Sequence, residues 1–167
     1  MTLNTGAMPV SIKINGHTYS AEVEPRRLLV DFVRENAGLT GTHVGCDTTN
    51  CGACTVIIDG RSVKSCTVFA VQASGHEVRT VEGLSDSEEL GVLQTAFHEN
   101  HALQCGYCTP GMLMSATQLL EENPNPTRDE IKGALVGNLC RCTGYRFILD
   151  AVEDAGRRLR ASEGRTS

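Results

Sequence analysis

The spacing of eight cysteines constrains this 167-residue chain more than any other feature, because they fall into two quartets. In the first quartet, four, two and eleven residues separate successive members: Cys46, Cys51, Cys54 and Cys66. In the second quartet, the corresponding gaps are two, thirty-one and one residues: Cys105, Cys108, Cys140 and Cys142. Two sets of four thiols, far apart in the sequence, predict two separate centres.

The first quartet has the spacing of plant-type ferredoxins, in which four thiolates hold a [2Fe–2S] cluster. Gly41, Gly45 and Gly52 lie in the same loop and allow the backbone to fold closely around an inorganic core. Four-cysteine zinc sites usually consist of two C-x2-4-C pairs with a longer gap, and disulfides need a secretory context. We therefore expect a [2Fe–2S] cluster with four ligands: Cys46, Cys51, Cys54 and Cys66.

The second quartet is less specific when its spacing is taken alone. The pair Cys105 and Cys108 fits a redox dithiol or half of a zinc site as well as part of a cluster. Cys140 and Cys142 can bind one centre together only from a turn, and glycines at positions 137 and 144 flank them. Both pairs precede predicted helices, whose N-terminal amides favour a negatively charged thiolate centre. A second cluster is the leading interpretation, with zinc and a redox dithiol as alternatives.

Hydrophobic periodicity divides the chain near residue 82. Residues 9–23 alternate apolar and polar side chains around Asn-Gly, and residues 55–64 flank an Asp-Gly turn, which together predict two β-hairpins. A short helix is expected from about residue 28, ending near Gly38, and a further strand over residues 77–81. We therefore predict an α+β fold class with a ferredoxin-like β-grasp domain over residues 1–82.

The second half shows only helical patterns. Four helices are predicted, over residues 85–102, 110–122, 127–136 and 145–159. Ser85 or Asp86 is expected to cap the first, and Thr127 with Glu130 forms a capping box for the third. Phe147 is assigned to the helical core, with a place at an interface as the alternative. Residues 83–167 are thus predicted to form an all-α four-helix domain that binds the second centre.

Composition and charge exclude several classes of protein. The net charge of −5 and the dispersed basic residues give no nucleic-acid-binding pattern. No apolar run reaches the ~18 residues that a membrane-spanning helix needs, and residues 1–10 lack the features of a signal peptide. We expect a cytoplasmic protein, whose thiols stay reduced and available to metal.

The residues around both quartets resemble those of the molybdenum hydroxylases, the xanthine oxidase family. Residues 45–56 are similar to the ferredoxin-like motif of the family, and residues 103–112 and 137–145 are similar to its second-cluster motifs. The resemblance covers residues 9–155, and the chain looks most like the small subunit of carbon monoxide dehydrogenase, through residues 62–67 and 69–73. One departure is Phe147, because many relatives have proline at this position.

The resemblance implies an electron-transfer subunit with two [2Fe–2S] clusters and no catalytic residue of its own. Its partners would be a large subunit with the molybdopterin cofactor and a medium subunit with FAD, in a dimer of heterotrimers. Electrons from substrate hydroxylation at molybdenum would pass through the helical-domain cluster, then the ferredoxin-domain cluster, to FAD. Gln104 and Cys142 would contact the pterin, and Cys142 would also bind its cluster. The pocket that selects carbon monoxide, an aldehyde, a purine or an N-heteroaromatic compound would lie on the large subunit.

Overall fold

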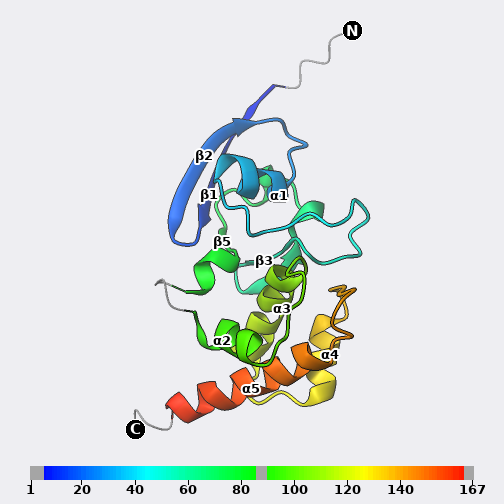
Figure 1. Ribbon diagram of the computed structural model, residues 1–167. Helices are drawn as coiled ribbons and strands as arrows, with labels where there is room; N and C mark the ends of the chain where they lie inside the picture. The colour runs from blue at the N-terminus through cyan, green and yellow to red at the C-terminus, as the bar shows by residue number, and fades with distance from the viewer. Residues whose placement is uncertain (1–5, 86–89, 164–167) are drawn as a thin grey trace.

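The computed structural model of the chain describes residues 6–85 and 90–163. Figure 1 shows a mixed β-sheet with a short helix at one end of the molecule and a group of α-helices at the other. The sheet precedes the helical group in the chain, so the predicted α+β class is confirmed.

Two hairpins supply four of the five strands of the sheet. β1 (Met8–Ile14) pairs with β2 (His17–Val23), and β3 (Thr55–Ile58) pairs with β4 (Arg61–Lys64). Type I′ turns require positive φ at both central residues. The two turns have such values: Asn15 (49°), Gly16 (82°), Asp59 (47°) and Gly60 (84°). Both hairpin predictions are confirmed.

The fifth strand, β5 (Glu77–Arg79), joins the two hairpins into one sheet. It runs parallel to β1 and antiparallel to β3, which gives the order β2-β1-β5-β3-β4. The strand ends earlier than predicted because the Thr80 N–H donates to Asn15 Oδ1 at 2.9 Å. A 3-10 turn (Val81–Leu84) follows directly.

One face of the sheet is covered by the short helix α1 (Leu29–Asp31) and the π-helical turn that continues it (Phe32–Asn36). Gly38, with φ of 72°, follows this turn and lies where the helix was predicted to end. The buried apolar side chains between helix and sheet include Val10, Ile12, Ile14, Leu29, Phe32, Val33, Val56 and Val78. Burial of each stabilises the fold by about 1.5–3 kcal/mol.

The second half contains the four predicted helices within the described residues. They are α2 (Val92–Glu99), α3 (Thr109–Glu122), α4 (Arg128–Leu135) and α5 (Arg146–Glu163). Their shared core includes Phe97, Met112, Ile131, Ile148 and Val152. Thr127 caps α4 as predicted, since its side chain accepts from the Glu130 N–H while the Glu130 carboxylate accepts from the Thr127 N–H at 2.6 Å.

The predicted start of the first helix was wrong. α2 begins at Val92 rather than near Ser85, and Gly91 is its N-cap, with the Gly91 N–H donating to Gln94 Oε1 at 2.8 Å. This later pairing satisfies the free amide at the helix start, so the helix does not extend back to residue 85. Ser85 has extended backbone at the end of the preceding 3-10 turn. Asp86 lies outside the described residues.

The assignment of Phe147 to the core was also wrong, because its side chain is 44% exposed. The next two residues of α5, Ile148 and Leu149, are buried against the other helices. Successive helical residues are about 100° apart around the axis, so Phe147 lies outside this buried stripe.

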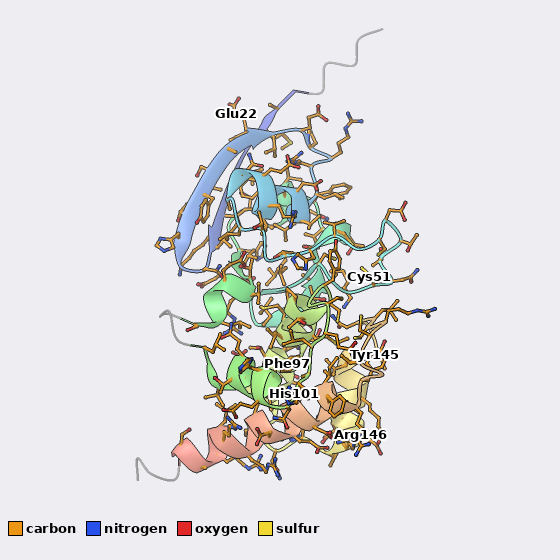
Figure 2. All side chains as sticks on the ribbon, viewed as in Figure 1. Glu22, Cys51, Phe97, His101, Tyr145 and Arg146 are labelled. Atoms are coloured by element: carbon orange, nitrogen blue, oxygen red, sulfur yellow. The ribbon has the colours of Figure 1, made fainter. Side chains whose placement is uncertain are left out.

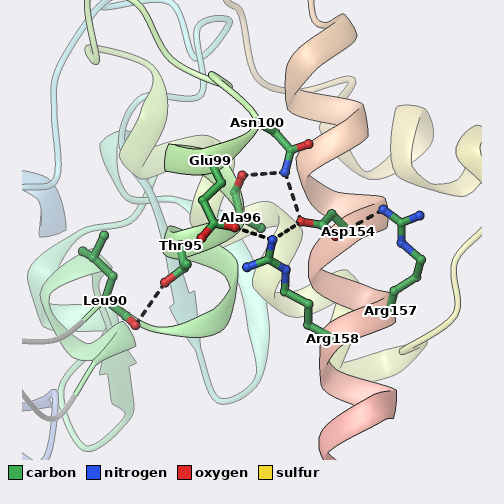
Figure 3. Close-up of polar contacts among 8 residues, drawn as sticks. All are labelled: Leu90, Thr95, Ala96, Glu99, Asn100, Asp154, Arg157 and Arg158. Atoms are coloured by element: carbon green, nitrogen blue, oxygen red, sulfur yellow. Dashed lines mark hydrogen bonds and ion pairs between the residues drawn. The ribbon is translucent and has the colours of Figure 1, made fainter.

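Polar contacts hold α2 against α5 (Figure 3). Asn100 Nδ2 donates to Asp154 Oδ2 at 3.1 Å and to the Ala96 carbonyl at 2.9 Å. Arg158 pairs with Asp154 at 2.6 Å and also with Glu99. Ion pairs near the protein surface contribute about 0–1 kcal/mol each, so the apolar core provides most of the packing energy between these helices.

Helix α3 connects the helical group to the sheet. Arg79 lies at the end of β5, and one of its guanidinium nitrogens donates to both carboxylate oxygens of Glu121, at 2.7 Å each. The Ser62 N–H of β4 donates to Gln118 Oε1 at 2.8 Å. None of the described helices is both long and apolar enough to cross a membrane.

Candidate metal centres

The first quartet lies in the loop between the π-helical turn and β3 and in the turn after β4 (Ser65–Thr67). Figure 2 places Cys51 in that loop, on the same side of the molecule as Tyr145. The thiols meet in two pairs. Cys51 interacts with Cys46, whose Sγ accepts the Cys51 N–H at 3.4 Å, and Cys54 interacts with Cys66.

Ser65 connects the two segments that carry Cys54 and Cys66. Its backbone N–H and its hydroxyl both donate to the Cys54 carbonyl, at 3.2 Å and 2.7 Å. Ser65 is fully buried, so these two hydrogen bonds are protected from water. The hairpin turn and this contact together bring Cys66 back to the loop cysteines.

The thiols of this quartet are in unequal electrostatic environments. Hydrogen bonds from the backbone N–H groups of Cys51 and Thr48 lower the pKa of Cys46 to about 6. Burial raises the pKa of Cys66 to about 12. Amides around Cys46 favour the thiolate, which is the form that binds metal, whereas Cys66 would release its proton when metal binds.

The second quartet lies in two turns that precede helices. Cys105 and Cys108 lie just before and at the N-cap of α3, and Cys140 and Cys142 lie before α5. These thiols are also paired: the Sγ atoms of Cys105 and Cys142 are 3.5 Å apart, and Cys108 interacts with Cys140. The structure therefore brings together all four members of each predicted quartet.

Several polar groups surround Cys140. The Thr143 N–H donates to Cys140 Sγ at 3.4 Å, and the Thr143 hydroxyl lies 3.1 Å from the same sulfur. The Cys140 N–H donates to the Tyr145 hydroxyl at 2.9 Å. Burial raises the pKa of the partner thiol, Cys108, to about 12. Hydrogen bonds to sulfur are one of the means by which proteins adjust cluster potentials.

The donor set of each quartet fits a two-iron cluster. A [2Fe–2S] cluster with four cysteine ligands needs two thiolates at each iron, and hence two thiol pairs. Both quartets provide two pairs, as described above. Within residues 6–85 and 90–163, no three His, Cys, Asp or Glu side chains surround a position for a single metal ion.

A closely packed seam joins the two cysteine regions. The Leu139 N–H donates to the Cys51 carbonyl at 2.8 Å. Asn138, which is 2% exposed, donates through Nδ2 to the Gly52 carbonyl at 3.0 Å and accepts from the Ser115 hydroxyl at 2.8 Å. Gly52 directly follows Cys51, and Asn138 and Leu139 directly precede Cys140. Ser115 lies in α3, the helix that follows Cys108.

An aromatic contact that was not predicted from the sequence also links the two regions. The rings of His43 and Tyr107 stack with centroids 4.7 Å apart, and the Tyr107 hydroxyl donates to the Val44 carbonyl at 2.7 Å. The two rings are 64 positions apart in the chain, and no periodic pattern connects them. Cysteine spacing likewise gave no indication of the buried contacts of Asn138 or of Lys64, whose ammonium lies near the first quartet.

The second quartet has an exposed side. Gln104, Cys105 and Cys142 are all exposed, whereas Cys54 of the first quartet is buried. Leu103 and Leu139 are likewise 41% and 55% exposed. The structure thus places Gln104 beside an accessible sulfur pair.

Two family profiles match the chain. One, described as "2Fe-2S iron-sulfur cluster binding domain", covers residues 12–85, and the other, "[2Fe-2S] binding domain", covers residues 80–153. The chain therefore contains two [2Fe–2S]-binding domains.

Named relatives are subunits of oxidoreductases. The chain is 51% identical over 146 residues to the nicotine 6-hydroxylase small subunit of Paenarthrobacter nicotinovorans, covering 87% of this chain and 88% of the relative. It is 48% identical over 147 residues to caffeine dehydrogenase subunit gamma of Pseudomonas sp. (strain CBB1), covering 86% and 88%.

A solved structure gives the same result. A chain of quinoline 2-oxidoreductase from Pseudomonas putida 86 superposes with a TM-score of 0.87 at 49% identity, covering 94% of this chain and 98% of that one. Together with the two domain matches, these similarities identify the chain. It belongs to the iron–sulfur small subunits of the molybdenum hydroxylase family.

Proposed function

We propose that this subunit relays electrons from a molybdopterin site on a large subunit, through two [2Fe–2S] clusters, to FAD on a medium subunit. The seam between the two quartets is the observation that carries the proposal. One hydrogen bond of 2.8 Å joins the carbonyl of Cys51 to the N–H of Leu139, the residue before Cys140. A short route of bonded atoms therefore runs from a thiol of one quartet to a thiol of the other.

The ligands of the first cluster would be Cys46, Cys51, Cys54 and Cys66, and those of the second Cys105, Cys108, Cys140 and Cys142. The observed contacts support one iron for each thiol pair. Each cluster would supply a one-electron redox centre. The chain's own residues would hold it and direct N–H and hydroxyl donors at its sulfur ligands.

The second centre would accept electrons first, because its side is open to a partner. Gln104 and Cys142 are both exposed, Gln104 directly precedes Cys105, and the sulfurs of Cys105 and Cys142 are 3.5 Å apart, so a pterin on the large subunit could bind here. An exposed amide can donate to and accept from a pterin ring through the same group. Gln104 and Cys142 would thus hold the edge of the molybdopterin cofactor against the second cluster.

Similarity to named relatives supports an N-heteroaromatic substrate for the complex. The names of these relatives refer to nicotine, caffeine and quinoline, each of which contains a nitrogen heterocycle. The remaining parts of the proposal are a boundary near residue 82 between the two domains, a cytoplasmic location, and a dimer of heterotrimers.

Anaerobic purification of the tagged chain from its native host tests this function. We expect a large and a medium subunit to co-purify with molybdenum and FAD, and an N-heteroaromatic substrate to bleach the visible absorption of the clusters. A brown chain that purifies alone, without molybdenum or flavin, would instead be a free-standing electron carrier. The variant Gln104→Ala should keep its iron and be reduced more slowly by substrate, while reduction by dithionite should be unchanged.

A further inference from the structure

Lys64 is the only one of the chain's three lysines without a carboxylate partner among the described residues. Lys13 pairs with Glu77 at 3.1 Å and Lys132 pairs with Asp129 at 2.8 Å. Lys64 ends β4 and is partly buried, and its ammonium donates to the Thr55 hydroxyl at 3.2 Å. A partly buried cation that has only a hydroxyl partner is costly unless an anion lies nearby.

The position of the ammonium is fixed between the two halves of the protein. A Cβ on Gly137 would lie 3.0 Å from Lys64 Nζ, so this nitrogen packs directly against the segment that leads to Cys140. The Thr55 hydroxyl that accepts from Lys64 also donates to the Gly52 carbonyl at 2.6 Å, inside the first cysteine loop. Lys64 therefore cannot turn toward solvent without losing contacts at the seam.

The charges that face this ammonium belong to the first quartet. Lys64 lies two residues before Cys66, and its hydroxyl partner Thr55 follows Cys54 directly, so the thiolate charges of this quartet act on the ammonium. Since a two-iron cluster with four thiolates is an anion in both oxidation states, it would supply the negative charge that Lys64 otherwise lacks. This step rests on the proposed binding of a cluster at the first quartet.

We propose that Lys64 is a positioning residue that raises the reduction potential of the first cluster and so directs electrons toward it. Reduction adds one negative charge to the cluster, and a fixed cation stabilises the reduced form more than the oxidised form. When one electron passes between the centres, the second cluster is oxidised and the first is reduced. A higher potential at the first cluster makes this transfer more favourable.

The test is an anaerobic redox titration of the assembled complex, followed by the electron paramagnetic resonance signals of the two clusters. Lys64→Gln keeps a hydrogen-bond donor and removes the charge, Lys64→Met removes both, and Lys64→Arg keeps the charge. Lys13→Met is the matched control in the same half of the chain. Cys66→Ser assigns the signal of the first cluster, because a changed ligand alters only its own cluster.

We expect Lys64→Gln and Lys64→Met to lower the reduced-to-oxidised ratio of the first cluster by about tenfold at a fixed potential. For a one-electron couple this is a shift of about 59 mV to lower potential. Lys64→Arg and Lys13→Met should match the wild type, and the second cluster should move much less than the first.

Three results would overturn the proposal. The first is an unchanged potential in both neutral variants when their iron content is normal. The second is an equal shift in Lys64→Arg, since this would attribute the effect to packing rather than charge. The third is a wild-type complex without a cluster signal from the first quartet, which would overturn the proposed function as well. The first two results leave the proposed function standing.

Discussion

Replacement of Gly111 by alanine should open the seam between the two cysteine regions. Gly111 lies in the first turn of α3, and a Cβ on it would lie 2.2 Å from the Gly52 carbonyl oxygen and 3.1 Å from Ala53 Cα. A normal carbon–oxygen contact is about 3.3 Å, so one backbone must move by about 1 Å. These two backbone atoms cannot rotate aside as a side chain does, and the Asn138 amide nitrogen, 3.0 Å from the same Cβ, is held by its hydrogen bond to the Gly52 carbonyl.

The cost follows from three contributions. Overpacking against rigid backbone costs about 3 kcal/mol, at the upper end of the usual range. Loss of the bond from Asn138 to the displaced Gly52 carbonyl costs about 1 kcal/mol more. The higher helix propensity of alanine returns about 1 kcal/mol. We therefore expect Gly111→Ala to lower the free energy of unfolding by about 3 kcal/mol.

Thermal unfolding of the iron-loaded protein, followed by circular dichroism, measures this effect. In a protein of this size, 1 kcal/mol corresponds to about 2–4 °C, so the Tm should fall by roughly 6–12 °C. Gly133→Ala is the matched control, because Gly133 also lies in a helix but a Cβ there would meet nothing within 4 Å. The control should gain about 1 kcal/mol. A Gly111→Ala protein as stable as the wild type would refute the close approach of the two regions.

Three further perturbations test other contacts. Thr127→Ala removes the cap of α4 and should cost about 1 kcal/mol in urea unfolding, whereas an unchanged midpoint would refute the capping box. Asn138→Ala leaves the buried Ser115 hydroxyl and the Gly52 carbonyl without their partner, and should cost about 2 kcal/mol by the same assay; a cost below about 0.5 kcal/mol would count against the seam. Removal of iron under reducing conditions should lower the Tm and expose eight titratable thiols; an unchanged Tm would argue against a stabilising centre.

Local signals in the sequence predicted most of the secondary structure. The two hairpins follow from Asn-Gly and Asp-Gly turns between strand-like segments, and α4 follows from its capping box. These signals are reliable because each depends on residues within a few positions of one another. The start of α2 was mispredicted because Ser85 and Asp86 have the side chains typical of an N-cap, whereas the N-cap in the structure is Gly91, which has no side chain to indicate it.

Contacts between distant residues could not be predicted. The early end of β5 depends on Thr80 and Asn15, which are 65 positions apart, and the stacking of His43 on Tyr107 spans a similar separation. The contact between Cys105 and Cys142 joins turns that are 37 positions apart, and the position of Lys64 depends on the packing of the two halves. Cysteine spacing identified the two groups of candidate ligands, whereas tertiary packing determines which groups adjust them.

The central claim is that each quartet holds a two-iron cluster, and direct analysis of iron, zinc and acid-labile sulfide tests it. The protein should be purified without oxygen and the three contents expressed per chain. The account predicts about four irons and about four sulfides, with no stoichiometric zinc. About two irons and one zinc per chain would contradict it, because only one quartet would then hold a cluster and no relay of two clusters could exist.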